Sequence, residues 1–172
     1  MIRNALERVC LALRGLASVI VVLLFAVMLV AVLVQVAGRY LFNFPIAPAA
    51  EIATFSQIWL VLLGAGVAVA RGQHVAIDVL PSQLPLPAAR VALIGITLVS
   101  ATFLAVLGYG AWPLMRLGQF QTSPSLRIPM IYMYACLPVG AAYMIVELLL
   151  SVIQRWNDPF PPPSVETEEE AV

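Results

Sequence analysis

Few side chains in this chain could do chemistry, and most of them lie in or beside apolar segments. The sequence of 172 residues contains nine basic residues, all arginine, nine acidic residues and one histidine, His74. A bis-histidine haem site needs two imidazoles that face one another, so His74 alone is not sufficient. Cys10 and Cys136 lie in separate segments without metal-ligand spacing. We therefore predict no catalytic residues, no cofactor and no metal site, and we expect His74 to have a structural role.

Glu51 is followed by Thr54 and Gln57 at three-residue steps, which places a polar stripe on one side of a predicted helix. Ionisable groups inside a membrane are costly and face a partner or water. One interpretation is an ion or proton relay. The other, which we favour, is an interfacial carboxylate that pairs with an arginine such as Arg39.

Glu147 forms a second stripe with Cys136, Gly140 and Tyr143, at spacings of four, three and four. A helical line that includes small residues is typical of a packed face. The sequence leaves two interpretations open. Glu147 meets an arginine or polar group of a neighbouring helix, in this subunit or another, or it extends toward the cytoplasm.

The elements that position these residues follow from the composition. Hydrophobic residues make up 62% of the chain, charged residues make up 10%, and the mean hydropathy is +0.99. A soluble domain is roughly a quarter charged. The net charge of zero also argues against a nucleic-acid partner. We therefore expect an all-α integral membrane protein.

Apolar runs of 22 to 25 residues are long enough to cross a hydrocarbon layer of roughly 30 Å. Breaks at Asn43, Pro45 and Pro48 and small residues four apart, such as Gly66 and Ala70, support helices that pack closely. The first run is too long for a cleaved signal peptide, so we interpret it as a retained helix. The four predicted transmembrane helices cover residues 15–38, 49–70, 91–115 and 130–153.

Two further segments complete the predicted organisation. Residues 74–80 are half apolar, and we expect a short interfacial helix there, after the second span. We divide the chain into a membrane domain, residues 1–156, and a proline-rich acidic tail, residues 157–172, which we expect to be disordered. With cytoplasmic N- and C-termini, six arginines lie inside and three outside, which the positive-inside rule favours.

Several segments resemble the DctQ-type small membrane subunit of TRAP (tripartite ATP-independent periplasmic) transporters. The resemblance covers nearly the whole chain except the acidic tail. It rests on Arg39-Tyr40-Leu41-Phe42-Asn43, Glu51–Phe55, Trp59–Gly64, Arg71–Asp78, Arg127–Pro129 and Leu137–Gly140.

This resemblance implies a sodium-coupled, ATP-independent uptake system for an organic acid in the bacterial inner membrane. Its partners are a large multi-span TRAP membrane subunit, which carries the substrate and sodium sites, and a periplasmic solute-binding protein. The small subunit is implied to be a scaffold. The residues expected to fix helix ends and subunit contacts are Arg39, Tyr40, Glu51, Trp59, Arg71, His74 and Asp78, to which the stripe analysis adds Glu147.

Two other functions stay open from the residues alone. The chain could be a redox membrane anchor for a soluble enzyme, although a single histidine argues against that function. It could also be a homo-oligomeric channel or exporter in which the stripe from Glu51 to Gln57 lines a shared pore.

Overall fold

The computed structural model describes residues 2–71 and 85–156, with side chains from Cys10 onward, as an all-α protein. Five helices follow one another: α1 (Ile2–Leu41), α2 (Ala47–Ala70), α3 (Leu86–Gly118), α4 (Ile131–Tyr134) and α5 (Cys136–Gln154). Four apolar stretches are long enough to cross a membrane, and α4 with α5 forms the last. The predicted four-span class is confirmed.

The helix ends differ from the predicted spans for physical reasons. Helix α1 begins at Ile2, thirteen residues before the predicted span, so the basic N-terminal segment belongs to the same helix. The last span divides at Ala135, which is turn-like, three residues before Pro138. Proline has no N–H to donate to the carbonyl of Tyr134, so the helical ladder is interrupted there. Pro138 therefore accounts for this short break between α4 and α5.

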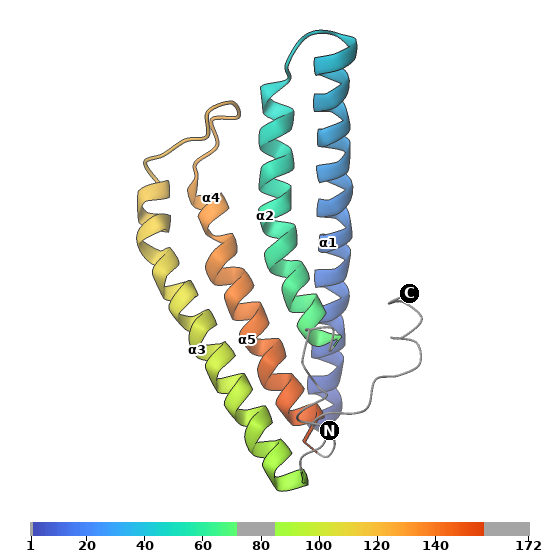
Figure 1. Ribbon diagram of the computed structural model, residues 1–172, viewed down its shortest axis with the longest axis vertical. Helices are drawn as coiled ribbons and strands as arrows, with labels where there is room; N and C mark the ends of the chain where they lie inside the picture. The colour runs from blue at the N-terminus through green and yellow to red at the C-terminus, as the bar shows by residue number, and fades with distance from the viewer. Residues whose placement is uncertain (1, 72–84, 157–172) are drawn as a thin grey trace.

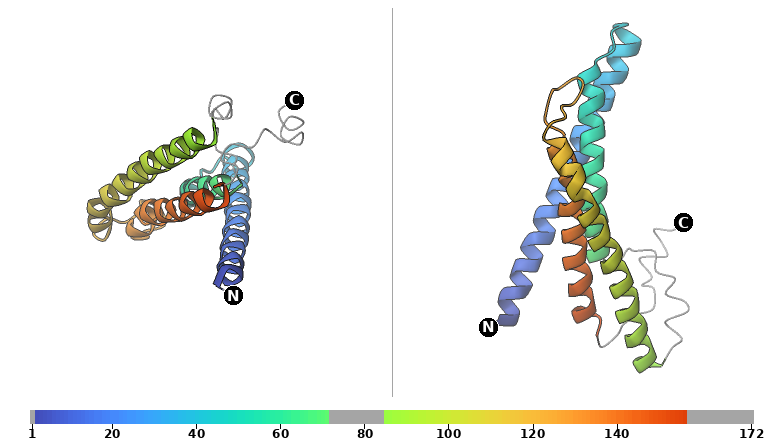
Figure 2. Two further views of the ribbon diagram at one scale, coloured as in Figure 1. Left: turned by 90° about the horizontal axis from the view of Figure 1, so that it is seen from below. Right: turned by 90° about the vertical axis from the view of Figure 1, so that its left-hand side faces the viewer.

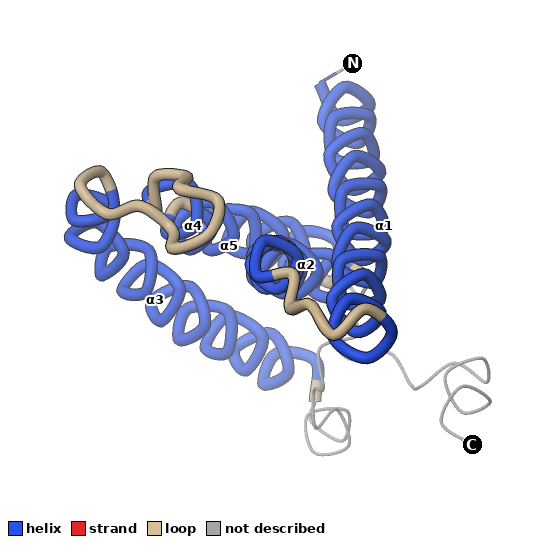
Figure 3. The backbone as a smooth tube through the Cα atoms, turned by 90° about the horizontal axis from the view of Figure 1, so that it is seen from above, coloured by secondary structure: helices blue, strands red, loops and turns tan. Residues whose placement is uncertain are grey.

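The spans lie side by side in the order α1, α2, α5, α3, as Figure 1 shows. Helix α1 packs on α2, α2 packs on α5, and α5 packs on α3. The view along the helices shows α1 and α3 diverging at the two edges (Figure 3). The arrangement is an open row of helices and not a closed bundle.

The turn between α1 and α2 and the loop between α3 and α4 lie at one end of the molecule (Figure 1). Asn43 adopts a left-handed conformation with φ of 51°, and the Phe44 N–H donates to the Gly38 carbonyl at 2.9 Å. Asparagine tolerates this conformation better than most residues, so it ends α1 and reverses the chain. The turn predicted from Asn43 and Pro45 is thus observed.

Small residues allow the helices to approach closely. A Cβ at Gly66 would overlap the ring of Tyr143, and a Cβ at Gly140 would lie 2.8 Å from that of Leu62. These two glycines therefore bring α2 and α5 together, as expected where helices associate in lipid through packing. On α1, the buried residues Ala17, Ala31 and Gly38 recur at multiples of seven along the face that contacts α2.

The core is small because much of the apolar surface faces outward. Leu104, Ala141 and Met144 form a buried cluster between α3 and α5. By contrast, large apolar side chains are exposed along the length of α1 and α3, among them Leu16, Leu33, Val99 and Val106. Such surface suits a lipid or protein environment inside the membrane, which supports the multi-pass membrane assignment.

Candidate functional site

Glu147 of α5, the most buried charged residue among the described residues, forms an ion pair with Arg14 of α1. Arg14 donates from Nε and Nη2 to Oε2 of Glu147, at 3.0 and 2.8 Å, and its Nε lies 3.3 Å from Oε1. The side chain of Glu147 is 2% exposed and that of Arg14 is 24% exposed. The forked guanidinium therefore satisfies both carboxylate oxygens, which is the geometry that lowers the cost of burying a charge.

The predicted Cys136 to Glu147 stripe is a packed face, as its residue types indicated. Cys136 and Gly140 are buried, and Tyr143 packs over Gly66 of α2. Of the two interpretations of Glu147, the structure supports contact with an arginine of another helix in the same chain, Arg14 of α1. Sequence reasoning did not identify Arg14 as that arginine. With four spans, the start of the first and the end of the fourth lie on the same side of the membrane, so the two residues could have been considered as partners.

Glu51 binds backbone and not an arginine in the described part of the chain. Its Oε2 accepts hydrogen bonds from the N–H groups of Ser125 at 3.2 Å and Leu126 at 2.7 Å, both in the loop between α3 and α4. The suggested pairing with Arg39 is therefore wrong. The physical reason is that adjacent loop N–H groups converge on the carboxylate and satisfy it directly.

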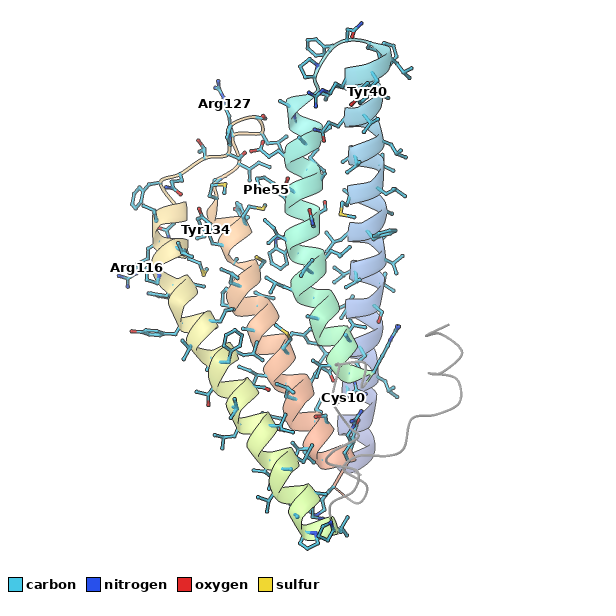
Figure 4. All side chains as sticks on the ribbon, in the orientation of Figure 1. Cys10, Tyr40, Phe55, Arg116, Arg127 and Tyr134 are labelled. Carbon is cyan, nitrogen blue, oxygen red and sulfur yellow. The ribbon has the colours of Figure 1, made fainter. Side chains whose placement is uncertain are left out.

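The loop that Glu51 holds is itself ordered by backbone contacts. Thr122 and Pro129 form an isolated antiparallel bridge, and Ser123 N–H donates to the Ile128 carbonyl at 2.9 Å. Arg127 has a φ of 55°, which closes the hairpin at its tip. In Figure 4 the Arg127 side chain projects from this loop, away from the helices. Glu51 thus ties the start of α2 to the loop before α4.

Trp59 makes a second connection from α2 to the last span. Its Nε1–H donates to the carbonyl of Tyr132 in α4 at 3.2 Å. That carbonyl lies just before the break at Ala135, where regular helical hydrogen bonding is interrupted. Glu51 and Trp59, which are eight residues apart on α2, therefore both hold the N-terminal end of the last span.

The other predicted residues lie apart from these contacts. Arg39 and Tyr40 are exposed at the end of α1, and Figure 4 places Tyr40 at the opposite end of that helix from Cys10. Arg71 is the C-terminal cap of α2, where its N–H donates to the Val67 carbonyl at 3.1 Å. His74 and Asp78 lie outside the described residues, as do the expected interfacial helix and the acidic tail.

Three hydroxyl groups in the spans donate to backbone carbonyls of their own helices. The Thr54 hydroxyl donates to the Ala50 carbonyl at 3.0 Å, Thr102 donates to Leu98 at 2.7 Å, and Ser151 donates to Leu148 at 2.7 Å. Within residues 2–71 and 85–156, no three His, Cys, Asp or Glu side chains are grouped as a metal site would require. The hydrogen bonds described above position helices and loops relative to one another.

A further pair of contacts anchors the opposite end of α3. Arg90 donates from Nε to the Trp156 carbonyl at 3.0 Å, and its guanidinium lies 5.3 Å from the centroid of that indole ring. The view from below and the side view place the start of α3 and the end of α5 near each other (Figure 2). This cation–π contact was not foreseen from the sequence, because its partners are 66 residues apart.

Comparison with known proteins gives two matches. Residues 28–158 match the family described as "Tripartite ATP-independent periplasmic transporters, DctQ component". The chain is also 37% identical over 84 residues to a protein of Haemophilus influenzae described as a TRAP transporter small permease protein. That alignment covers 49% of this chain and 45% of the relative, so the match spans about half the length of each.

Proposed function

The chain belongs to the DctQ family of small membrane subunits of TRAP transporters, and we propose that it acts as a membrane scaffold for the large subunit of such a transporter. As a transporter component it is not an enzyme. The observation that carries the scaffold role is that the buried and interfacial carboxylates, Glu147 and Glu51, are both occupied by contacts within the chain. Neither is left free to bind a transported solute.

The surface of the molecule supports a partner in the membrane. Helix α1 has almost its entire apolar length exposed, and α3 forms the other edge of the row. A second membrane protein can pack against such a row by van der Waals contacts and a few hydrogen bonds, which are the forces that associate helices in lipid. We propose the large multi-span subunit as that partner and a periplasmic solute-binding protein as the third component.

The finer features of the transport system are proposed from the family. We propose sodium-coupled, ATP-independent uptake of a carboxylate-bearing solute across the bacterial inner membrane, with the solute and ion sites in the large subunit. We also propose that both ends of this chain are cytoplasmic, since six of nine arginines then lie inside. The test is to fuse the C-terminus to a reporter enzyme that is active only in the periplasm. If the C-terminus is cytoplasmic, this reporter should stay inactive.

The residues proposed to fix helix ends and subunit contacts are Arg39, Tyr40, Glu51, Trp59, Arg71, His74, Asp78 and Glu147. For Glu51, Trp59 and Glu147 the contacts within the chain support a role in holding the helices in register. A rigid row of helices would present a constant surface to the large subunit. Their effect on transport would therefore be indirect.

The decisive experiment is gentle solubilisation of the native complex through a tag on this chain. We expect a large multi-span membrane protein to be recovered in stoichiometric amount. Recovery of the chain alone as a homo-oligomer would instead support the channel function. Glu51→Ala and Asp78→Ala should weaken assembly more than substrate recognition, with Glu51→Gln as the matched variant. Unchanged co-purification and unchanged uptake in the alanine variants would contradict this role.

A further inference from the structure

The N-terminal part of α1 is lightly packed. From Cys10 to Leu16 no residue is buried, and burial on this helix begins at Ala17. Among the described residues, the α1 backbone packs on α2 and not on α5. Figure 2 shows this end of α1 diverging from α3 and α5. The ion pair of Arg14 with Glu147 is therefore the contact that holds this end of α1 to α5.

A glycine lies directly after the arginine of this pair. A Cβ at Gly15 would meet no atom within 4 Å, so packing within the chain does not require glycine there. Glycine is a poorer helix former than alanine, because it loses more backbone freedom on folding. Gly15 therefore makes α1 easier to bend between Arg14 and Ala17, where burial on this helix begins.

Tyr143 of α5 has a buried hydroxyl that makes no hydrogen bond to any described residue. Its ring lies over Gly66 of α2, and its hydroxyl lies beside the Glu147 carboxylate, outside hydrogen-bonding geometry. The two residues are one turn apart on the same side of α5. A buried hydroxyl without a partner costs stability, so its presence calls for an explanation. The carboxylate thus has a second donor beside it that the present arrangement leaves unused.

We propose that Glu147 is a two-position latch, which binds Arg14 when the N-terminal part of α1 is held to α5 and binds the Tyr143 hydroxyl when that part moves away by bending at Gly15. Loss of Arg14 alone would leave a buried carboxylate without a partner, which is strongly destabilising. A hydroxyl that donates to a carboxylate forms a charge-assisted hydrogen bond and replaces that partner. Arg14 is already 24% exposed and can be hydrated after release. From Ala17 onward α1 stays packed on α2, so the row of helices is preserved.

This latch goes beyond the scaffold function and is tested on the full chain alone, by unfolding in mixed micelles. In the wild-type chain, Tyr143→Phe should leave the folding equilibrium constant unchanged or raise it, because the hydroxyl has no partner. In an Arg14→Ala chain the same change should lower that constant about tenfold, the order that a charge-assisted hydrogen bond contributes. An equal effect of Tyr143→Phe in the two backgrounds would overturn the proposal.

Two further variants complete this comparison. Tyr109 of α3 is the matched control, because its side chain is exposed and Tyr109→Phe removes the same hydroxyl far from Glu147. That change should have the same effect in both backgrounds. If Arg14→Ala does not fold, Arg14→Lys replaces it. Lysine keeps the charge but lacks the fork of donors, so one carboxylate oxygen is left for Tyr143. Tyr143→Phe should then lower the folding constant in the Arg14→Lys chain, and no change there would overturn the latch.

The labelling rate of Cys10 with a water-soluble maleimide measures the movement itself. Cys10 lies one turn before Arg14 and is half-buried, whereas Cys136 is buried and serves as the internal reference. Arg14→Ala should raise the labelling rate of Cys10 several-fold, and Gly15→Ala should lower it. Equal rates in wild type and Arg14→Ala would overturn the release, and equal rates in wild type and Gly15→Ala would overturn the bend. These measurements do not involve the large subunit, so failure of the latch is distinguishable from failure of the scaffold role.

Discussion

Arg14 of α1 and Glu147 of α5 form an ion pair across 133 positions of sequence, although the α1 backbone packs along α2 and not along α5. The pair therefore connects an edge helix to a helix two places away in the row. Tyr143, one turn before Glu147, has a buried hydroxyl without a hydrogen-bond partner in the described residues. The ion pair thus lies beside a contact between α2 and α5 in which the Tyr143 hydroxyl adds no hydrogen bond.

Removal of the Glu147 carboxylate should destabilise the chain by leaving Arg14 without its partner. Loss of one member of a buried ion pair costs about 3–5 kcal/mol, and the partial exposure of Arg14 places Glu147→Ala near 3 kcal/mol. Unfolding in mixed micelles, followed by circular dichroism, measures this free energy. In a double-mutant cycle, Arg14→Ala with Glu147→Ala should cost less than the sum of the single changes. Strict additivity would show that the pair contributes no coupling.

Glu51→Ala should release the loop between α3 and α4. Two backbone N–H groups, those of Ser125 and Leu126, would lose their acceptor. Since hydrogen bonds to a charged group contribute about 1.5–3 kcal/mol when shielded and less when exposed, we expect roughly 1–2 kcal/mol. The local measurement is hydrogen exchange at these amides, which should accelerate. Glu51→Gln retains one carbonyl acceptor and should show a smaller effect; identical exchange in wild type and Glu51→Ala would contradict the contact.

Gly140→Ala should disturb the α2–α5 contact, because its methyl group would lie 2.8 Å from the Leu62 Cβ. Overpacking of this kind costs about 1–3 kcal/mol. A Cβ at Gly110 of α3 would meet nothing within 4 Å, so Gly110→Ala is the matched control. That control should be neutral or stabilising by up to about 1 kcal/mol, since alanine is the better helix former.

The same contact can be tested by compensation. The overlapping atom is the Leu62 Cβ, which alanine keeps, so compensation requires glycine: Leu62→Gly alone should cost stability by leaving space beside Gly140, whereas Leu62→Gly with Gly140→Ala should recover part of that loss. Thermal unfolding in a constant detergent measures the three variants. If the stability loss of the double variant equals the sum of the two single losses, residues 62 and 140 are not in close contact.

Trp59→Phe should weaken the attachment of α4 to α2. The change removes the Nε1–H that donates to the Tyr132 carbonyl and preserves most of the ring. A net loss of about 1 kcal/mol is expected for one neutral hydrogen bond. Trp112→Phe is the control, because that indole is exposed on α3 and its face contacts Arg116. Equal unfolding midpoints for the two variants would contradict the proposed attachment.

The sequence by itself determined the number, type and approximate limits of the spans. Hydropathy and helix breaking are local properties, so apolar runs and residues such as Asn43 and Pro45 indicate where helices cross and turn. It also identified Glu147 as part of a packed face, because residues three and four apart share one side of a helix. The extension of α1 to Ile2 was missed, since the basic segment is not apolar and a helix can continue beyond the membrane.

Only the tertiary structure decided which side chains meet. Glu51 lies near Arg39 in sequence, but its carboxylate binds the N–H groups of Ser125 and Leu126, and the partner of Glu147 is Arg14. The order α1, α2, α5, α3 likewise depends on where glycine permits close approach. In lipid, one apolar helix face is as soluble as another, so shape and a few polar contacts select the neighbours. Those interactions join residues far apart in the chain, and no local pattern specifies them.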